Sequence, residues 1–322
     1  LEETRKDVRE ILDLTSELKI IYNLIERSVS RLIEKMENKE KKNLGLTLTI
    51  VCNITSNYGE SLGNASSVQK VFKNGKIYAT RSRESMKNAI MTQSGMYDDL
   101  KVVVDKKVTQ KEVTEKLNAS NCRALEGGYM NTNNLTVIRK SSFYLTDAVA
   151  CDEFVNETRF HNNLCLASTY ARDNGINLQE KAGESGLMPY QYEFDKSLKK
   201  YSITFDLDKV GVDENFNAEA EVSEKIERVN LILETIENLS LVVKGNLDNA
   251  EPLMIFGGIG NCKTHYFDNV VNVTKSTLNI TDELIERLNK GNYKMAFIEG
   301  GNFVNENEIK EKLNPISVTD FF

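Results

Sequence analysis

The sequence contains no tryptophan, only three prolines, two histidines and five cysteines among its 322 residues. The odd number of widely spaced cysteines, with no C-x-x-C pair, argues against both a disulfide framework and a zinc site. Reduced cysteines are usual inside cells, so we expect a cytoplasmic protein. No apolar run approaches the roughly 20 residues that a membrane-spanning helix needs, and no pattern predicts a secretory signal. We therefore expect no membrane partner.

Residues suited to catalysis are few. His161 and His265 lie in neither an H-E-x-x-H motif nor a G-x-S-x-G elbow. Gly257–Gly260 is glycine-rich and follows a short apolar strand, but it lacks the Lys-Ser/Thr pair of a phosphate loop. A tight turn is the simpler interpretation of these glycines. A nucleotide-dependent enzyme that uses the Gly257–Gly260 loop remains an alternative, and no metal site or cofactor is predicted.

Asparagine is abundant, at about a tenth of the chain, and N-x-S/T sequons recur along it. In an exported protein these would be glycosylation sites, so an exported glycoprotein is a second alternative. A composition this rich in asparagine also produces such triplets by chance. We therefore interpret the sequons as a consequence of composition.

The net charge of -7 is distributed unevenly. Residues 1–43 are neutral overall, residues 44–140 hold fourteen basic and eight acidic side chains, and the remainder is strongly acidic. An acidic protein is ordinarily a poor candidate for binding nucleic acid. Charges act over a Debye length of roughly 8 Å at physiological salt, so a basic face can bind an anion on a protein that is acidic overall. The segment 44–140 is the candidate for such a face.

Apolar periodicity and turn residues predict an α+β fold with a mainly antiparallel sheet. Residues 1–43 have the pattern of one long amphipathic helix, and LTLTIVCNI at 46–54 that of a central strand. Residues 71–80 predict a hairpin that turns at Asn74-Gly75. Helices are expected at 81–93, with Ser82 as the N-cap, and at 222–237.

Two neighbouring segments have side chains suited to a nucleic acid. The polar loop 55–67 combines small residues with Tyr58, whose ring suits a base or sugar. Arg81, Arg83 and Lys87 lie at a helix start, where exposed N–H groups favour phosphate. From these residues alone, a solvated basic turn is an equal alternative.

The residues that carry a family resemblance begin in this same region. The stretch LTLTIVCNITSNYGESLGNASSVQKVFKNGKIYATRSRESMKNAI at 46–90 resembles the start of the DevR/Cst2 family. RKSSFYLTDAVACDEF at 139–154, PYQYEFDKSLKKYSITFDLDKVG at 189–211 and GGIGN at 257–261 follow in the family's order. Members are guide-RNA-binding backbone subunits of type I CRISPR Cascade complexes, and this sequence is most similar to type I-B.

The resemblance implies a ferredoxin-like, RRM-related palm with inserted fingers at about 95–135 and a β-hairpin thumb at about 160–192. Residues 44–322 would form this RNA-binding domain, with 1–43 as an appended helix. Such subunits polymerise as a helical filament along guide RNA in antiviral defence. The implied partners are the guide RNA, target DNA paired to it, further copies of the chain, and the large, small and 5′-handle-capping subunits.

The resemblance also implies which residues contact RNA. Ser56, Asn57, Tyr58 and Asn64 match the first RNA-contacting loop, and Ser82, Arg83, Lys87 and Asn88 match the helix start that holds phosphates. Ser141, Ser142 and Phe143 match a palm segment beside the RNA, and the basic residues Arg81, Arg139 and Lys140 complete the candidate set. Related type III subunits cleave RNA with an Asp in the first loop. This loop has none, so we expect a protein that is not an enzyme.

Overall fold

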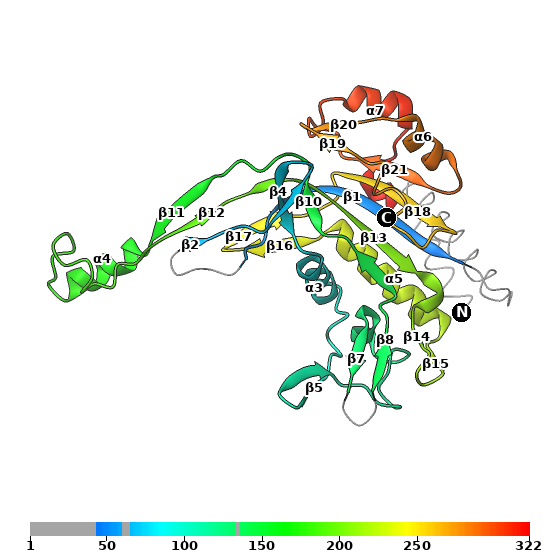
Figure 1. Ribbon diagram of the computed structural model, residues 1–322, viewed down its shortest axis with the longest axis horizontal. Coiled ribbons are helices and arrows are strands. Elements are labelled where there is room, and N and C mark those ends of the chain that lie inside the picture. The colour runs from blue at the N-terminus through cyan, green and yellow to red at the C-terminus, as the bar shows by residue number, and fades with distance from the viewer. Residues whose placement is uncertain (1–42, 60–64, 133–135) are drawn as a thin grey trace, which may run out of the picture.

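An eight-stranded antiparallel sheet forms the centre of the protein (Figure 1). The computed structural model describes residues 43–59, 65–132 and 136–322, so nearly all of the predicted helix 1–43 lies outside the described residues. The strand order is β21-β18-β1-β13-β10-β4-β3, and β9 pairs with β13 beside this path. The strands are β1 (Gly45–Thr55), β3 (Lys70–Lys73), β4 (Lys76–Arg81), β9 (Phe143–Leu145), β10 (Ala148–Ala150), β13 (Lys196–Asp206), β18 (Met254–Gly260) and β21 (Lys294–Phe297).

The central strand β1 is buried on both of its faces. Its alternating Leu48, Ile50 and Cys52 enter the core on one face of the sheet. On the other face Thr47 and Thr49 meet hydroxyl partners on β13, so that buried polar groups stay hydrogen-bonded. The predicted strand at 46–54 and the antiparallel α+β class are thereby confirmed.

Helices cover both faces of the sheet. Helices α3 (Arg83–Gln93) and α5 (Val222–Glu237) pack on one face through Met86, Ile90, Ile232 and Ile236. Helices α6 (Asp282–Asn289) and α7 (Glu306–Leu313) join a second cluster on the other face. Short elements complete the body: η2 (Leu207–Lys209), β14 (Val212–Asp213), β15 (Ala218–Glu219), β16 (Ser240–Val243), β17 (Asn246–Asn249), β19 (Val273–Thr274), β20 (Thr277–Leu278) and α8 (Val318–Phe321).

Two excursions leave the sheet in different directions (Figure 1). The insertion, residues 95–140, contains β5 (Val102–Asp105), β6 (Val108–Lys111), η1 (Arg123–Gly127), β7 (Tyr129–Asn131) and β8 (Val137–Arg139) around a small core of its own. The arm, residues 155–195, is built from β11 (Thr158–Asn162), α4 (Leu164–Asp173) and β12 (Pro189–Glu193). The short strand β2 (Ala65–Ser66) pairs in parallel with β12 at the root of the arm.

The glycine-rich segment forms a strand, so the prediction of a loop at Gly257–Gly260 is wrong. All four residues belong to β18 and pair with β1. A Cβ at Gly257 would lie 2.0 Å from the Thr47 carbonyl oxygen, and one at Gly260 would lie 2.4 Å from the Tyr293 hydroxyl. The glycines therefore allow close backbone packing. The alternative of a nucleotide-dependent enzyme assumed a loop at these residues, and the structure has a strand there.

All five cysteines are free. No helix in the described part of the chain is long and apolar enough to cross a membrane.

Candidate nucleic-acid interface

The first loop leaves the end of β1 over a buried polar network. The Thr55 amide donates to Asp248 Oδ2 at 2.6 Å, and the Ser56 hydroxyl donates to Asp195 Oδ2 at 2.7 Å. Burial by itself would raise the pKa of Asp248, but the hydrogen bonds from Thr55 and Lys196 outweigh it and hold the pKa below its usual value. Ser56 is fully buried and therefore positions the loop from beneath.

A buried lysine completes this network. Lys199 donates to the Ile54 carbonyl oxygen at 2.9 Å and to Asp195 Oδ2 at 2.5 Å, and its side chain is fully buried. Burial lowers the pKa of Lys199, while the carboxylate of Asp195 opposes that shift. Sequence reasoning missed Asp195, Lys199 and Asp248, because alternation along a strand does not reveal a buried ion pair.

Asn57 and Tyr58 connect the loop to its neighbours. The Asn57 side-chain oxygen accepts the amide N–H of Ser82 at 2.9 Å, so it joins the loop to the start of α3. The Tyr58 hydroxyl donates to the Glu193 carbonyl oxygen at 2.8 Å, which joins the loop to the arm. Burial raises the pKa of Tyr58 to about 12, so its hydroxyl remains a donor at neutral pH. Asn64 lies outside the described residues.

The start of α3 is capped as the sequence predicts. The Ser82 hydroxyl accepts the amide of Ser85 at 3.3 Å, which satisfies one of the free N–H groups of the first turn. The Arg83 amide donates to Asp147 Oδ1 at 2.8 Å, and the half-exposed Arg83 side chain lies between Glu84 and Asp147. A carboxylate thus occupies the position where phosphate was expected.

Arg81 and Asn88 have opposite environments. Arg81 is buried, donates to the Thr55 carbonyl oxygen at 3.3 Å, and has an Nε with no partner among the described residues. Burial lowers its pKa. Asn88 lies on the exposed side of α3. Arg81 therefore supports the loop from inside the protein, whereas Asn88 is accessible to a ligand.

Lys87 points inward. Its ammonium donates to the Gly127 carbonyl oxygen at 3.0 Å and to Ser141 Oγ at 2.9 Å, and it lies 4.5 Å from the centre of the Phe143 ring. Burial, reinforced by the nearby cations Lys111 and Arg139, lowers its pKa to about 8. Lys87 therefore joins α3 to the insertion.

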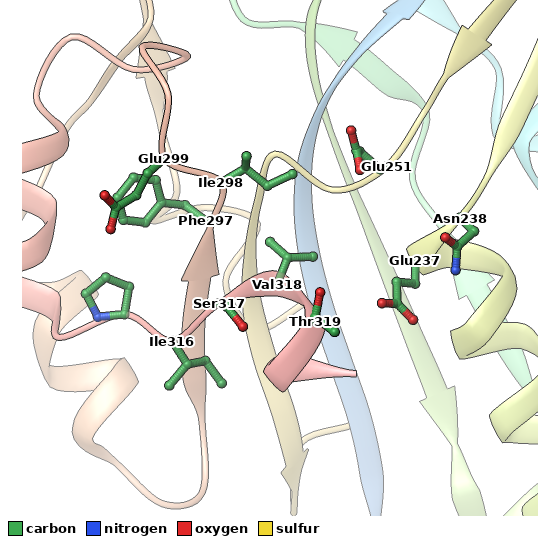
Figure 2. A pocket seen from close by; sticks show the side chains of 11 residues that line it. Glu237, Asn238, Glu251, Phe297, Ile298, Glu299, Ile316, Ser317, Val318 and Thr319 are labelled. Carbon is green, nitrogen blue, oxygen red and sulfur yellow. The ribbon is translucent and has the colours of Figure 1, made fainter. Parts of the chain in front are cut away.

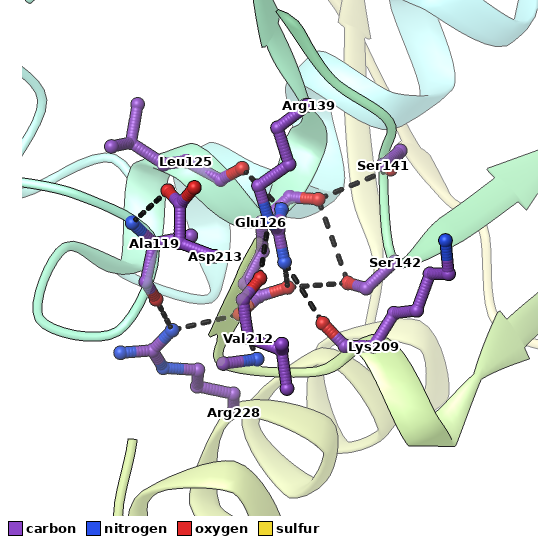
Figure 3. A network of polar contacts seen from close by, with 12 residues as sticks. Ala119, Leu125, Glu126, Arg139, Ser141, Ser142, Lys209, Val212, Asp213 and Arg228 are labelled. Atoms are coloured by element: carbon purple, nitrogen blue, oxygen red, sulfur yellow. Dashed lines mark hydrogen bonds and ion pairs between the residues drawn. The ribbon is translucent and has the colours of Figure 1, made fainter. Parts of the chain in front are cut away.

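The segment 139–143 lies mostly in a buried network around Glu126 (Figure 3). Arg139 donates to Glu126 Oε2 at 3.2 Å and to three backbone carbonyl oxygens, and Ser142 donates to the same carboxylate at 2.5 Å. On the other side Arg228 of α5 donates to Glu126 Oε1 at 2.7 Å. Phe143 is fully buried and stacks on Phe205.

Of the predicted residues in this segment, only Lys140 is exposed; Arg139, Ser141, Ser142 and Phe143 are buried. The structure brings the three predicted segments, which are the first loop, the start of α3 and the segment 139–143, together around α3. The loop contacts Ser82 through Asn57, and Lys87 contacts Ser141. The exposed members are Arg83, Asn88 and Lys140, and Tyr58 is half-buried. An exposed lysine that the sequence did not single out, Lys244 of the β16–β17 turn, lies over the Tyr58 ring.

A hollow also lies away from this interface. A cavity of about 450 Å³ lies between the end of α5 and the C-terminal segment (Figure 2). Glu237, Glu251, Ile298 and Val318 are among the residues that line it. None of the predicted site residues contributes to this cavity. No group of metal-ligating side chains occurs within the described ranges.

The fold is similar to that of a chain from a CRISPR RNA-guided surveillance complex. A chain of a structure titled "CRISPR RNA-guided surveillance complex, pre-nicking" is similar with a TM-score of 0.54 and 11% identity, over 80% of this chain and 93% of that one. A chain of a "CRISPR RNA-guided surveillance complex" has a TM-score of 0.49 and 13% identity, with coverage of 80% and 90%. At these identities the likeness concerns the fold alone.

The family follows from the sequence. Residues 46–281 match the family described as "CRISPR-associated negative auto-regulator DevR/Csa2", and the chain belongs to this family. The predicted DevR resemblance is thereby confirmed, while assignment to type I-B stays a prediction. No curated protein matches the chain.

Proposed function

We propose that this chain is a guide-RNA-binding backbone subunit of a CRISPR surveillance complex. The observation that carries the proposal is membership of the DevR/Csa2 family over residues 46–281, together with a fold shared with a chain of a surveillance complex. In this proposal the sheet is the palm, the insertion supplies the fingers, and the arm is the thumb.

The exposed residues around α3 support a contact with the RNA backbone. Arg83 and Lys140 offer cations and Asn88 an amide, and the half-buried Tyr58 ring belongs to the loop that contacts the start of α3 through Asn57. Phosphate contacts fix position without reading sequence, so base pairing between the guide and its target supplies the specificity. The remaining predicted residues with inward-pointing side chains then act indirectly, by holding the exposed ones in place. They are Ser56, Arg81, Lys87, Arg139, Ser141, Ser142 and Phe143.

The partners follow from this role. We propose guide RNA as the direct ligand, target DNA as the strand that pairs with it, and further copies of the chain along the same RNA. The large, small and 5′-handle-capping subunits of a type I-B complex in the cytoplasm would complete the assembly, with residues 1–43 as an added contact. The first loop contains no Asp, so the role is structural and not that of a nuclease.

The proposal is tested by coexpression with guide RNA and partner subunits. The purified complex is expected to contain RNA of uniform length and to absorb more strongly at 260 than at 280 nm. The double change Arg83→Ala, Lys140→Ala removes two cations, so the slope of log K against log salt should decrease by about 1.4. Binding should weaken correspondingly at any one salt concentration.

A matched control changes two exposed lysines away from this interface, Lys290→Ala just after α6 and Lys294→Ala at the start of the edge strand β21. The control alters total charge equally and should leave the salt slope unchanged. A wild-type protein that purifies without RNA would refute the proposed function. An equal effect of both double variants would instead refute the assignment of the interface.

A further inference from the structure

A single lysine contacts three segments at the root of the arm. Lys244 Nζ lies 4.5 Å from the centre of the Tyr58 ring and 4.9 Å from that of Tyr192, and it donates to Ser66 Oγ at 3.2 Å. These partners belong to the first loop, to β12 and to β2. A cation held over two aromatic rings is attracted by both. Lys244 therefore connects the β16–β17 hairpin to the loop and to the arm.

The backbone at this lysine has a conformation that it shares with Lys106, Lys107 and Lys275. Lys244 has a φ of 46°, in the left-handed region that favours glycine, and Gly245 follows with a φ of 79°. The β3–β4 hairpin uses Asn74-Gly75 for the same kind of turn, which is the less strained choice. Lysine thus occupies a position where asparagine would fit more easily, and its side chain makes the contacts described above.

The other contacts at the root of the arm are polar. Lys70 forms an ion pair with Glu193 at 2.5 Å, and Asp195 accepts the Ser56 hydroxyl and the Lys199 ammonium. Glu193 accepts the Tyr58 hydroxyl at its carbonyl oxygen, and its carboxylate accepts the Val68 amide at 3.0 Å. The parallel pairing of β12 with β2 covers only Gln191 and Tyr192. No residue from 155 to 193 belongs to any of the packed apolar clusters of the described chain. The direction of the arm is therefore set by polar and aromatic contacts, and those of Lys244 are the ones that join the arm to the β16–β17 hairpin.

We propose that Lys244 is a positioning residue that sets the direction of the arm and so the number of nucleotides that each subunit spans. This inference rests on the proposed function. From the rise per residue of β12 and α4, the tip lies roughly 28 Å from the root. A rotation of about 10° at the root would move the tip by about 5 Å, which exceeds the roughly 3.4 Å between nucleotides along a strand.

The test compares Lys244→Met, which keeps the length of the side chain without its charge, with Lys244→Arg, which keeps the cation. The readout is the nuclease footprint of complexes that hold increasing numbers of subunits on one RNA. Lys244→Met should still bind RNA, but its footprint per added subunit should differ from wild type by at least one nucleotide or become uneven. Lys244→Arg should restore the wild-type increment. An unchanged increment in Lys244→Met would overturn the proposal.

The matched control is Lys275→Met, which removes an exposed lysine from another left-handed turn, that of the β19–β20 hairpin. It should leave the footprint unchanged, and an equal effect in this control would also overturn the proposal.

A second measurement does not require RNA. Pulsed electron paramagnetic resonance reports the distance between a spin label on the exposed Cys165 of the arm and one on a Lys290→Cys body variant, with Cys151 and Cys262 replaced by Ala. The distance distribution should shift or broaden in Lys244→Met and return in Lys244→Arg. An identical distance distribution in Lys244→Met and wild type would overturn the role of Lys244, whether or not the protein binds RNA. A wild-type protein that binds no RNA would refute the proposed function but would leave this measurement valid.

Discussion

At the scale of single residues, Lys87 shows how a cation can be used inside the protein. Its ammonium donates to Gly127 and Ser141, but no carboxylate contacts it in the described structure. Burial is the largest cause of its lowered pKa, and Lys111 and Arg139 add to the effect. The charge of Lys87 is therefore costly in the folded state.

The lowered pKa of Lys87 predicts that the stability of the folded protein depends on pH. The folded pKa of Lys87, about 8, lies below its ordinary value of 10.5, so between these values the unfolded chain binds more protons than the folded one. The contribution of Lys87 to stability should therefore rise with pH across that window. Relative to Lys87→Met, the wild-type free energy of unfolding should increase by on the order of 1–3 kcal/mol between about pH 7 and pH 10.

Urea denaturation of both proteins at several pH values measures this difference. The variant serves as the control for every other group that titrates in the same range. A constant difference across the window would contradict the prediction, because it would mean that Lys87 keeps an ordinary pKa in the folded protein.

The individual side chains of the site could be located from sequence only in part. In the run Arg139-Lys140-Ser141-Ser142, the sequence marks the segment but does not distinguish the exposed Lys140 from its buried neighbours. That distinction depends on Glu126, which lies in the insertion and accepts hydrogen bonds from both Arg139 and Arg228. Arg228 is 102 residues away from Glu126 along the chain, and no local pattern predicts such a pairing.

At the scale of elements, the glycines of β18 determine how closely the central strands approach. The backbone of β18 lies so near β1 that a Cβ at Gly257 would meet the Thr47 carbonyl oxygen and the Leu48 backbone at once. Both of these contacts are with the backbone of β1 and not with the flexible end of a side chain, so they cannot be relieved without disturbing β1. The strand pair therefore depends on glycine at this position.

Gly257→Ala should consequently destabilise the protein by about 3 kcal/mol or more, which is the upper range for overpacking in a core. The matched control is Gly183→Ala, because a Cβ there would meet nothing within 4 Å. Thermal and urea unfolding of both variants would measure the effect. Equal stability of Gly257→Ala and wild type would show that β18 and β1 are not packed as described.

Elements with local signals were predicted well. The helix at 222–237 is α5 with the same bounds, Ser82 caps α3, and Asn74-Gly75 forms the turn between β3 and β4. Periodicity, capping and turn chemistry act over a few residues, so one sequence suffices to show them. The role of Gly257–Gly260 could not be predicted in this way, because it depends on where β1 and Tyr293 lie.

At the scale of the whole molecule, the arm is separate from the packed body. Large apolar side chains near its tip are exposed, including Leu166 at 73% and Met188 at 55%. They contribute nothing to the four packed clusters of the described residues. Exposed apolar side chains on a projecting element are typical of surfaces that other molecules cover.

Removal of the arm tip should therefore leave the body intact. Replacing 163–188 with a two-residue Asn-Gly turn would join Asn162 directly to its paired neighbour Pro189. The melting temperature should change by less than about 3 °C, roughly the effect of 1 kcal/mol in a domain of this size. Native mass spectrometry should show single subunits on RNA but no arrays. A large loss of stability, or arrays of normal length, would contradict this prediction.

The continuity of the chain at the arm has a mechanical consequence. Strand β12 is followed, after Phe194 and Asp195, by β13, which pairs with β1 along all eleven residues from Lys196 to Asp206. Tension applied along the arm would load these hydrogen bonds in shear, so that they share the force instead of breaking one after another. Tension at the tip pulls β11 and β12 in the same direction, so the ladder between them carries little of the load, and the long β13–β1 pairing serves as the anchor of the arm.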